Sequence, residues 1–203
     1  FAAGVAFGEN PATGDCRVCG SLASLAGLEK ALAANDLALI DNAIKRILLI
    51  HSIILSIGGV PLLYSGDELG LLNDYSYQRD ATKAHDGRWV HRIAIENKDI
   101  LLAEDPSTHF NRISAGLQDM ILTRKSTPVF GSAQTHILDA QNEHVFAYKR
   151  CFTDAGQYLI ALCNFSESEQ SICIDNLVPA ATSDMQDLIS KQRVVIAGQT
   201  LAI

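Results

Sequence analysis

An acidic pair, Asp67 and Glu68, follows the most apolar stretch of the chain and is the first group that could do chemistry. Residues 60–64 just before it are apolar on both faces, which is typical of a parallel strand covered by helices or closed in a barrel. In such folds ligands bind at the carboxyl ends of the strands. We therefore expect residues 65–68 to meet a ligand; a solvated acidic loop is the alternative interpretation.

Two arginines and one further aspartate are candidates for binding a substrate. Arg17 follows a loop rich in Gly, Asn, Pro and Asp, while Asp86 and Arg88 lie in a polar stretch, residues 71–105, that is far longer than a usual connection. A guanidinium group suits sugar hydroxyls and carboxylates. The alternatives are a solvated Arg17, a structural ion pair for Arg88, and a purely bracing role for Asp86 and Asp67.

Trp89, the only tryptophan, offers an aromatic face that can stack on a sugar ring. Burial behind Arg88 is the simpler interpretation of a tryptophan at this position. His51 lies within an apolar run and is most simply a hydrogen-bonded core residue. We therefore rest no substrate contact on either side chain.

Cysteine and histidine spacings indicate neither a metal site nor a cofactor. Cys16 and Cys19 form a lone C-x-x-C pair, and zinc would need a second pair or histidines at ligand spacing. His85 and His91 are six residues apart without a third ligand. Five cysteines without regular spacing also argue against a disulfide framework. We expect free thiols and a cytoplasmic, reducing compartment.

Composition narrows the class of partner. The net charge is −7, with 48% hydrophobic and 19% charged residues, and no cluster of Lys and Arg suited to nucleic acid or an anionic membrane. The longest apolar run is too interrupted, by His51, Gly58 and Pro61, to cross a membrane. The chain opens on Phe1 without a basic region, so we expect no signal peptide and a processed or truncated product.

The hydrophobic pattern predicts an α/β part followed by an all-β part. We expect a helix from Ser21 to Asn35 and a second from Asp36 to Gly58, with Ser21 and Asp36 as their N-caps, and a last helix over residues 106–125. From Val129 the period changes to two, which predicts an antiparallel β-sandwich. The expected strands are residues 135–138, 144–148, 158–165, 170–174, 193–196 and 200–203. The predicted domains are residues 1–128 and 129–203.

Three segments in order resemble the α-amylase superfamily (glycoside hydrolase family 13), most closely its amylosucrases: residues 10–18, 59–68 and 88–92. The resemblance implies the last part of a (β/α)8 TIM barrel, then a C-terminal sandwich. It implies a glucosyltransferase that moves glucose from sucrose to an α-1,4-glucan through a covalent glucosyl-enzyme. Sucrose, the α-glucan and the N-terminal part of the same enzyme would be its partners.

The resemblance also assigns roles to site residues. Arg17 matches an arginine on the acceptor or fructosyl side, and Arg88 one that pairs with an Asp from another loop at the base of the glucose pocket. Asp86 and Asp67 would support the same loops. We therefore expect substrate-binding residues in this chain, and the Asp that pairs with Arg88 outside it.

The family's three catalytic carboxylates lie on earlier barrel strands, so we expect no catalytic residue here and an inactive C-terminal fragment. Retaining chemistry needs two carboxyls about 5–5.5 Å apart, and the adjacent Asp67 and Glu68 do not match that pair. One alternative is part of a sucrose hydrolase or another family 13 enzyme. An alternative of a different class is that residues 129–203 form a non-catalytic carbohydrate-binding module.

Overall fold

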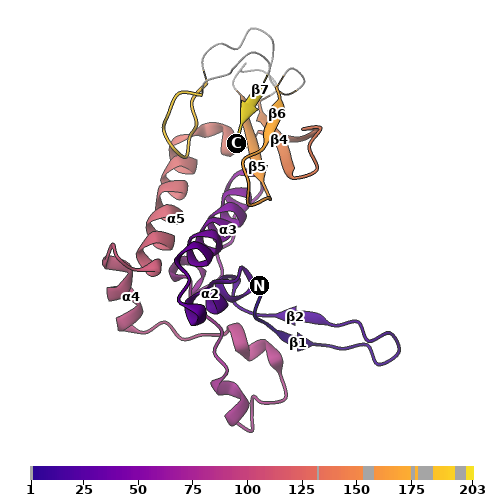
Figure 1. Ribbon diagram of the computed structural model, residues 1–203, viewed down its shortest axis with the longest axis vertical. Helices are drawn as coiled ribbons and strands as arrows, with labels where there is room; N and C mark the ends of the chain where they lie inside the picture. The colour runs from indigo at the N-terminus through magenta and orange to yellow at the C-terminus, as the bar shows by residue number, and fades with distance from the viewer. Residues whose placement is uncertain (1, 132, 153–157, 175–176, 178–184, 195–199) are drawn as a thin grey trace. The chain divides into compact units, whose positions relative to one another are not determined.

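The computed structural model describes residues 2–131, 133–152, 158–174, 177, 185–194 and 200–203. The chain forms two compact units, the first from residues 1–50 and 62–118 and the second from residues 51–61 and 119–203. Two long helices, α3 (Leu37–Ser56) and α5 (His109–Ser126), each contribute to both units. Figure 1 shows the order of the elements along the chain.

The first unit opens with a β-hairpin. Strands β1 (Val5–Phe7) and β2 (Arg17–Cys19) pair antiparallel, and the loop between them extends away from the helices that follow (Figure 1). The backbone N–H of Gly14 closes a turn by donating to the carbonyl of Asn10 over 2.8 Å. Gly14 takes a φ of +74°, a conformation that suits glycine.

The predicted helix from Ser21 to Asn35 is two helices, α1 (Leu22–Leu25) and α2 (Leu28–Ala34). Gly27 separates them because its φ of +101° lies outside the helical range. Both predicted caps are confirmed. The Ser21 hydroxyl accepts from the Ser24 N–H, and the Asp36 carboxylate accepts from the backbone N–H groups of Ala38 and Leu39 in α3.

The core of the first unit lies where α1, α2, α3 and α5 pack together. Seven buried residues form it: Ala23, Ala26, Leu28, Ala43, Ile44, Ile47 and Ile113. The buried positions on α3 and α5 follow helical spacing, as the sequence predicts. This core fixes the helices to which the hairpin and the polar stretch are attached.

The predicted strand at residues 60–64 is wrong for this structure. The segment has no strand assignment, and Val60 and Leu62 expose 94% and 76% of their surface. A strand needs neighbours for its backbone groups, and every sheet among the described residues is antiparallel and formed by other segments. Those residues show no closed barrel.

The long polar stretch contains short helices rather than an unstructured loop. These are η1 (Asp67–Leu69), η2 (Ser76–Arg79), η3 (Gly87–His91) and α4 (Asn97–Glu104). The helix α4 was not predicted; it begins with a capping box in which Glu96 and Asp99 bond to each other's backbone. The last predicted helix is confirmed as α5, with Ile113 and Leu117 buried.

The second unit carries small antiparallel sheets. Strands β3 (Gln134–Leu138), β4 (Val145–Cys151) and β5 (Tyr158–Asn164) pair in that order, and β6 (Ser171–Cys173) pairs with β7 (Thr200–Ala202). A short turn, η4 (Pro128–Phe130), precedes them. The period-two pattern therefore predicted antiparallel pairing correctly. Whether they complete a sandwich domain beginning at 129 stays a prediction.

One predicted strand, residues 193–196, is only partly described. Arg193 makes a single antiparallel bridge with Gln186. Residues 195–196 lie outside the described residues. Buried residues from β4 and β6, with their neighbours, form the core of this unit: Ala140, Val145, Ala147, Ile172, Ile174 and Leu177.

Candidate functional site

The best-defined polar arrangement in the first unit is the pair of Asp86 and Arg88. Arg88 Nε donates to Asp86 Oδ1 and Arg88 Nη2 to Asp86 Oδ2, both over 2.9 Å. Asp86 is also the N-cap of η3, since its Oδ1 accepts from the Arg88 backbone N–H at 3.0 Å. The side chain of Arg88 is 50% exposed and that of Asp86 14%. The forked guanidinium group of Arg88 is therefore held in one orientation, while part of it remains exposed to solvent.

This pairing shifts the pKa of both groups. Hydrogen bonds from the Arg88 side chain and backbone lower the pKa of Asp86 to about 2. The same contact raises the pKa of Arg88. Both groups are thus charged at neutral pH. The expected Asp from another loop stays a prediction, because in this structure the carboxylate bound to Arg88 is the neighbouring Asp86.

The hairpin supplies a second arginine beside this pair. Arg88 Cζ lies 4.9 Å from the centre of the Phe7 ring. Phe7 on β1 is directly opposite Arg17 on β2, and directly opposed residues of an antiparallel pair share one face. Arg17 therefore lies on the same face of the hairpin as Phe7, the residue that Arg88 contacts.

Glycine at position 87 lets η3 approach the hairpin closely. A Cβ atom there would lie 3.3 Å from both the Ala6 carbonyl oxygen and Val5 Cγ1. Such contacts are tighter than ordinary van der Waals packing. Gly87 therefore helps to place Arg88 over Phe7.

His91 links the acidic residues after residue 64 to η3. Its ring packs edge-on against Tyr64, with the centroids 5.5 Å apart. Burial, followed by the charge of Arg92, lowers the pKa of His91, while Asp67 and Asp86 oppose this shift. Asp67 and Asp86 are therefore both close enough to act on one imidazole. From the sequence, His91 was a candidate only for a metal ligand, because its contact with Tyr64 depends on the fold.

Asn73 ties the polar stretch to the start of the chain. Its Oδ1 accepts from the Ser21 backbone N–H at 2.8 Å, and its Nδ2 donates to the Ala3 carbonyl at 3.1 Å and to the Tyr75 hydroxyl at 3.0 Å. Tyr75 in turn donates to Glu29. Nothing in the sequence singles out Asn73, because its partners are distant in the chain.

Trp89 is partly buried and braces the loop. Lys83 Nζ lies 4.9 Å and Arg92 Cζ 4.7 Å from the centre of the Trp89 ring. Such cation–π contacts hold residues on both sides of η3 against one ring. This favours the bracing interpretation over a sugar platform.

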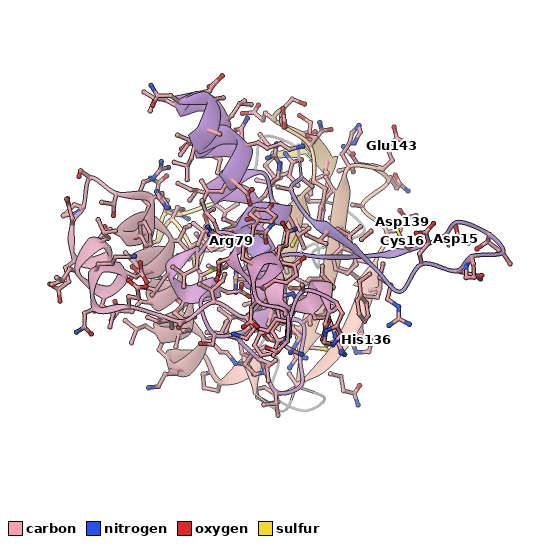
Figure 2. All side chains as sticks on the ribbon, turned by 90° about the horizontal axis from the view of Figure 1, so that it is seen from below. Asp15, Cys16, Arg79, His136, Asp139 and Glu143 are labelled. Atoms are coloured by element: carbon pink, nitrogen blue, oxygen red, sulfur yellow. The ribbon has the colours of Figure 1, made fainter. Side chains whose placement is uncertain are left out.

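The described residues contain no cluster of three or more His, Cys, Asp or Glu side chains that could hold a metal ion. The five thiols are free. Cys16 and Cys19 stand three residues apart along extended chain, about 10 Å, which exceeds the separation a disulfide spans. Figure 2 places Asp15 and Cys16 toward the outer end of the hairpin. Among the described helices none is long and apolar enough to cross a membrane.

Comparison with known proteins finds relatives by sequence, one of which is described here. No family model matches the chain. It is 31% identical over 138 residues to a glucosylglycerate phosphorylase from Escherichia coli (strain K12), which covers 68% of this chain and 24% of that protein. The chain therefore spans about a quarter of the length of the curated relative that it matches.

Solved structures share the fold. A variant of AmyP in complex with maltotriose has a TM-score of 0.61 at 14% identity, over 80% of this chain and 33% of that one. An inactive MutB double mutant in complex with isomaltulose has a TM-score of 0.53 at 17% identity, over 77% of this chain and 36% of that one. A variant of Bacillus licheniformis trehalose-6-phosphate hydrolase has a TM-score of 0.53 at 15% identity, over 78% of this chain and 37% of that one. Together with the sequence relative, they relate the chain to sugar-active enzymes of the α-amylase family.

Proposed function

We propose that this chain provides substrate-binding loops of an α-amylase-family enzyme that transfers glucose from sucrose to an α-1,4-glucan, the reaction of amylosucrases. The observation that carries the proposal is the fixed fork of Arg88 and Asp86 beside Phe7 and Arg17. Both arginines belong to segments that resemble amylosucrases. In such an enzyme the glucosyl unit is bound covalently to the enzyme after it leaves the donor and before it reaches the acceptor.

Arg88 can bind a sugar while it stays bound to Asp86. A guanidinium group carries five N–H donors, and the two hydrogen bonds to Asp86 use only two of them. The others can donate to hydroxyl groups of a glucosyl unit, and Asp86 keeps the plane of the fork in place. Asp67 and His91 line the neighbouring side of this site, and Arg17 lies toward the leaving or acceptor group.

The carboxylates of this chain serve binding rather than bond cleavage. Asp86 is committed to Arg88, and the Glu68 side chain accepts from the backbone N–H of Gly66 at 2.8 Å. The nucleophile and the acid of the proposed reaction therefore come from residues outside this chain. If water rather than a glucan takes the glucosyl unit, the same site serves a sucrose hydrolase.

A second candidate function is phosphorolysis, in which inorganic phosphate takes the glucosyl unit. The likeness to the glucosylglycerate phosphorylase favours it, since that protein is a relative of this chain by sequence. Phosphate needs cationic donors at the acceptor side. Arg17 is the residue of this chain that could supply them.

The test uses the protein that carries these residues, purified in the form its cells make. It is incubated with sucrose alone, with maltooligosaccharides and with inorganic phosphate, and fructose, glucose, glucose 1-phosphate and glucan length are measured. Fructose release with glucan elongation supports the amylosucrase reaction, and glucose 1-phosphate supports phosphorolysis. No consumption of sucrose under any of these conditions overturns the proposal.

A further inference from the structure

Three consecutive apolar residues of α4 are exposed: Ile100, Leu101 and Leu102. Leu101 leaves 64% of its surface exposed, whereas Asp99 of the same helix is only 6% exposed. Helical residues four apart share a face, so Asp99 and the half-buried Ala103 mark the inner face of α4, and Leu101 lies opposite them. The helix therefore buries a carboxylate and exposes apolar side chains, the reverse of the usual amphipathic arrangement.

Hydrogen bonds at both ends of α4 hold it in this orientation. At the first turn, the Glu96 backbone N–H donates to Asp99 Oδ2 over 2.9 Å as part of the capping box. At the last turn, two side chains next to the start of α5 donate to carbonyls of α4: Thr108 to Leu102 over 2.6 Å, and Asn111 to Ala103 over 2.8 Å. Figure 1 shows α4 beside the start of α5. The exposed apolar face is thus a fixed feature of the first unit.

The charge and the size of this face narrow what can cover it. Glu96, Glu104 and Asp105 are exposed around it, and Lys98 is the only basic residue of α4. An anionic membrane would be repelled by these carboxylates. A symmetric contact with a second copy would bring each acid close to its own counterpart. The face also supplies only a few side chains, while a stable interface between separate proteins uses about 20–30 residues a side.

We propose that the outer face of α4 docks against an apolar surface of the same protein that lies outside these 203 residues. The match covers 24% of the curated relative, so a protein of that length has most of its residues elsewhere. Because such a surface belongs to the same polypeptide, its effective concentration is high and a small apolar face suffices. The docked surface is apolar and carries no acidic group at the contact. This inference does not depend on the reaction that the protein carries out.

The test compares the 203-residue chain with the protein purified in the form its cells make. In the chain alone, Leu101→Glu should change the melting temperature by less than about 2 °C, because the new carboxylate is solvated. In the longer protein it should lower the melting temperature by about 4 °C or more, since the carboxylate meets an apolar surface. Leu101→Met keeps an apolar side chain of similar volume and should leave both forms close to wild type.

A second measurement reports the exposure of the face directly. The variant Leu101→Cys is treated with a maleimide, and the modification of position 101 is followed by mass spectrometry of its peptide. The reaction should be at least about 10-fold slower in the longer protein than in the chain alone, as expected if the face is open in less than a tenth of the molecules. This measurement does not depend on how the two forms unfold.

The matched control is Leu37→Glu, because Leu37 is 78% exposed at the start of α3 in the same unit. It should change the melting temperature by the same small amount in both forms. A loss as large in Leu37→Glu as in Leu101→Glu, or equal labelling of position 101 in the two forms, overturns the proposal. Labelling that slows as the concentration of the chain alone rises assigns the face to a second copy and overturns it too. The proposal also fails if the cells make only these 203 residues.

Discussion

The side-chain oxygen of Asn73 accepts a hydrogen bond from the backbone N–H of Ser21, 2.8 Å away and 52 residues earlier in the chain. The backbone N–H of Asn73 in turn donates to the Ser24 hydroxyl at 2.9 Å. Asn73 thus fixes the polar stretch to the start of α1, and the hairpin enters α1 at the same point. The relative position of Arg17 and Arg88 depends on this connection.

Replacing Asn73 with Ala should therefore destabilise the first unit. The change leaves the Ser21 N–H and the Ala3 carbonyl without their partner, and an unsatisfied buried group costs about 1–3 kcal/mol. Because the site is only partly buried, we expect the lower half of that range. Urea unfolding of Asn73→Ala measures it, with Gln78→Ala as the exposed amide control. Equal stability of the two variants would contradict the role of Asn73.

A second prediction concerns the glycine pair after α3. Both Gly58 and Gly59 have positive φ, +123° and +75°. A Cβ atom at Gly58 would overlap the guanidinium of Arg150, whereas one at Gly59 meets nothing within 4 Å. Arg150 is 2% exposed and donates to the Ile57 carbonyl at 2.8 Å. The two positions thus differ in packing as well as in φ.

We expect Gly59→Ala to cost about 1–2 kcal/mol, the penalty of the left-handed conformation, and Gly58→Ala to cost clearly more. The additional cost arises because Arg150 must give up its hydrogen bonds inside the second unit. Thermal unfolding of both variants checks the order. If Gly58→Ala is the more stable of the two, the close approach to Arg150 is not a constraint in solution.

The sequence could predict those features that depend on residues close together in the chain. Ser21 and Asp36 were recognisable caps because a capping side chain bonds to N–H groups two or three residues away. Residues 60–64 were misjudged because strand pairing depends on partners elsewhere in the chain. The helix α4 was not predicted because Ile100 and Leu101 are exposed, so no apolar stripe marks it. Its cap uses Glu96 where Ser or Thr is usual.

The candidate site was likewise only partly predictable from the sequence. Arg17, Arg88, Asp86 and Asp67 were found from residue type and resemblance, and the structure brings Asp86 and Arg88 together. The contacts of Phe7 with Arg88 and of His91 with Tyr64 could not be predicted, because each joins segments far apart in the chain. Residue type thus suggested candidates, while their arrangement needed the fold.

The third prediction is a pH dependence of stability. The pKa of Asp86 in the folded chain is about 2, below the value of about 3.9 in an unfolded chain. A lowered folded pKa stabilises the fold above the unfolded pKa, and this contribution is lost as pH falls from about 4 to about 2. The difference in melting temperature between wild type and Asp86→Asn should therefore be present at pH 6 and vanish near pH 2. Glu104→Gln, at an exposed carboxylate of α4, is the control and should show no such dependence.

The fourth prediction is that the 203-residue chain alone does not release glucose or fructose from sucrose. Cleavage with retention needs two carboxyls across the scissile bond, and Asp86 and Glu68 are occupied by other contacts. The assay compares the purified chain with a blank without protein. Turnover above the blank would show that a nucleophile and an acid lie among these residues after all.

The last prediction concerns Arg88 in the protein as its cells make it. Arg88→Ala removes the fork and leaves Asp86, which is 14% exposed, without its cation. Because the Arg88 side chain is half exposed, solvent screens the charge that remains on Asp86, so the effect on stability is modest. We therefore expect a small loss of melting temperature and a larger loss of kcat/KM on sucrose, about 10- to 100-fold if charged hydrogen bonds to the sugar are lost.

Lys98→Ala is the matched control, because Lys98 also pairs with a carboxylate two residues earlier, Glu96, over 2.7 Å at an exposed position. It should leave both the kinetics and the melting temperature close to wild type. A kinetic defect in Arg88→Ala alone identifies Arg88 as a substrate-binding residue. If Arg88→Ala lowers the melting temperature but keeps its kcat/KM, the pair with Asp86 only braces η3, and the sugar contacts of the proposed site must come from other residues.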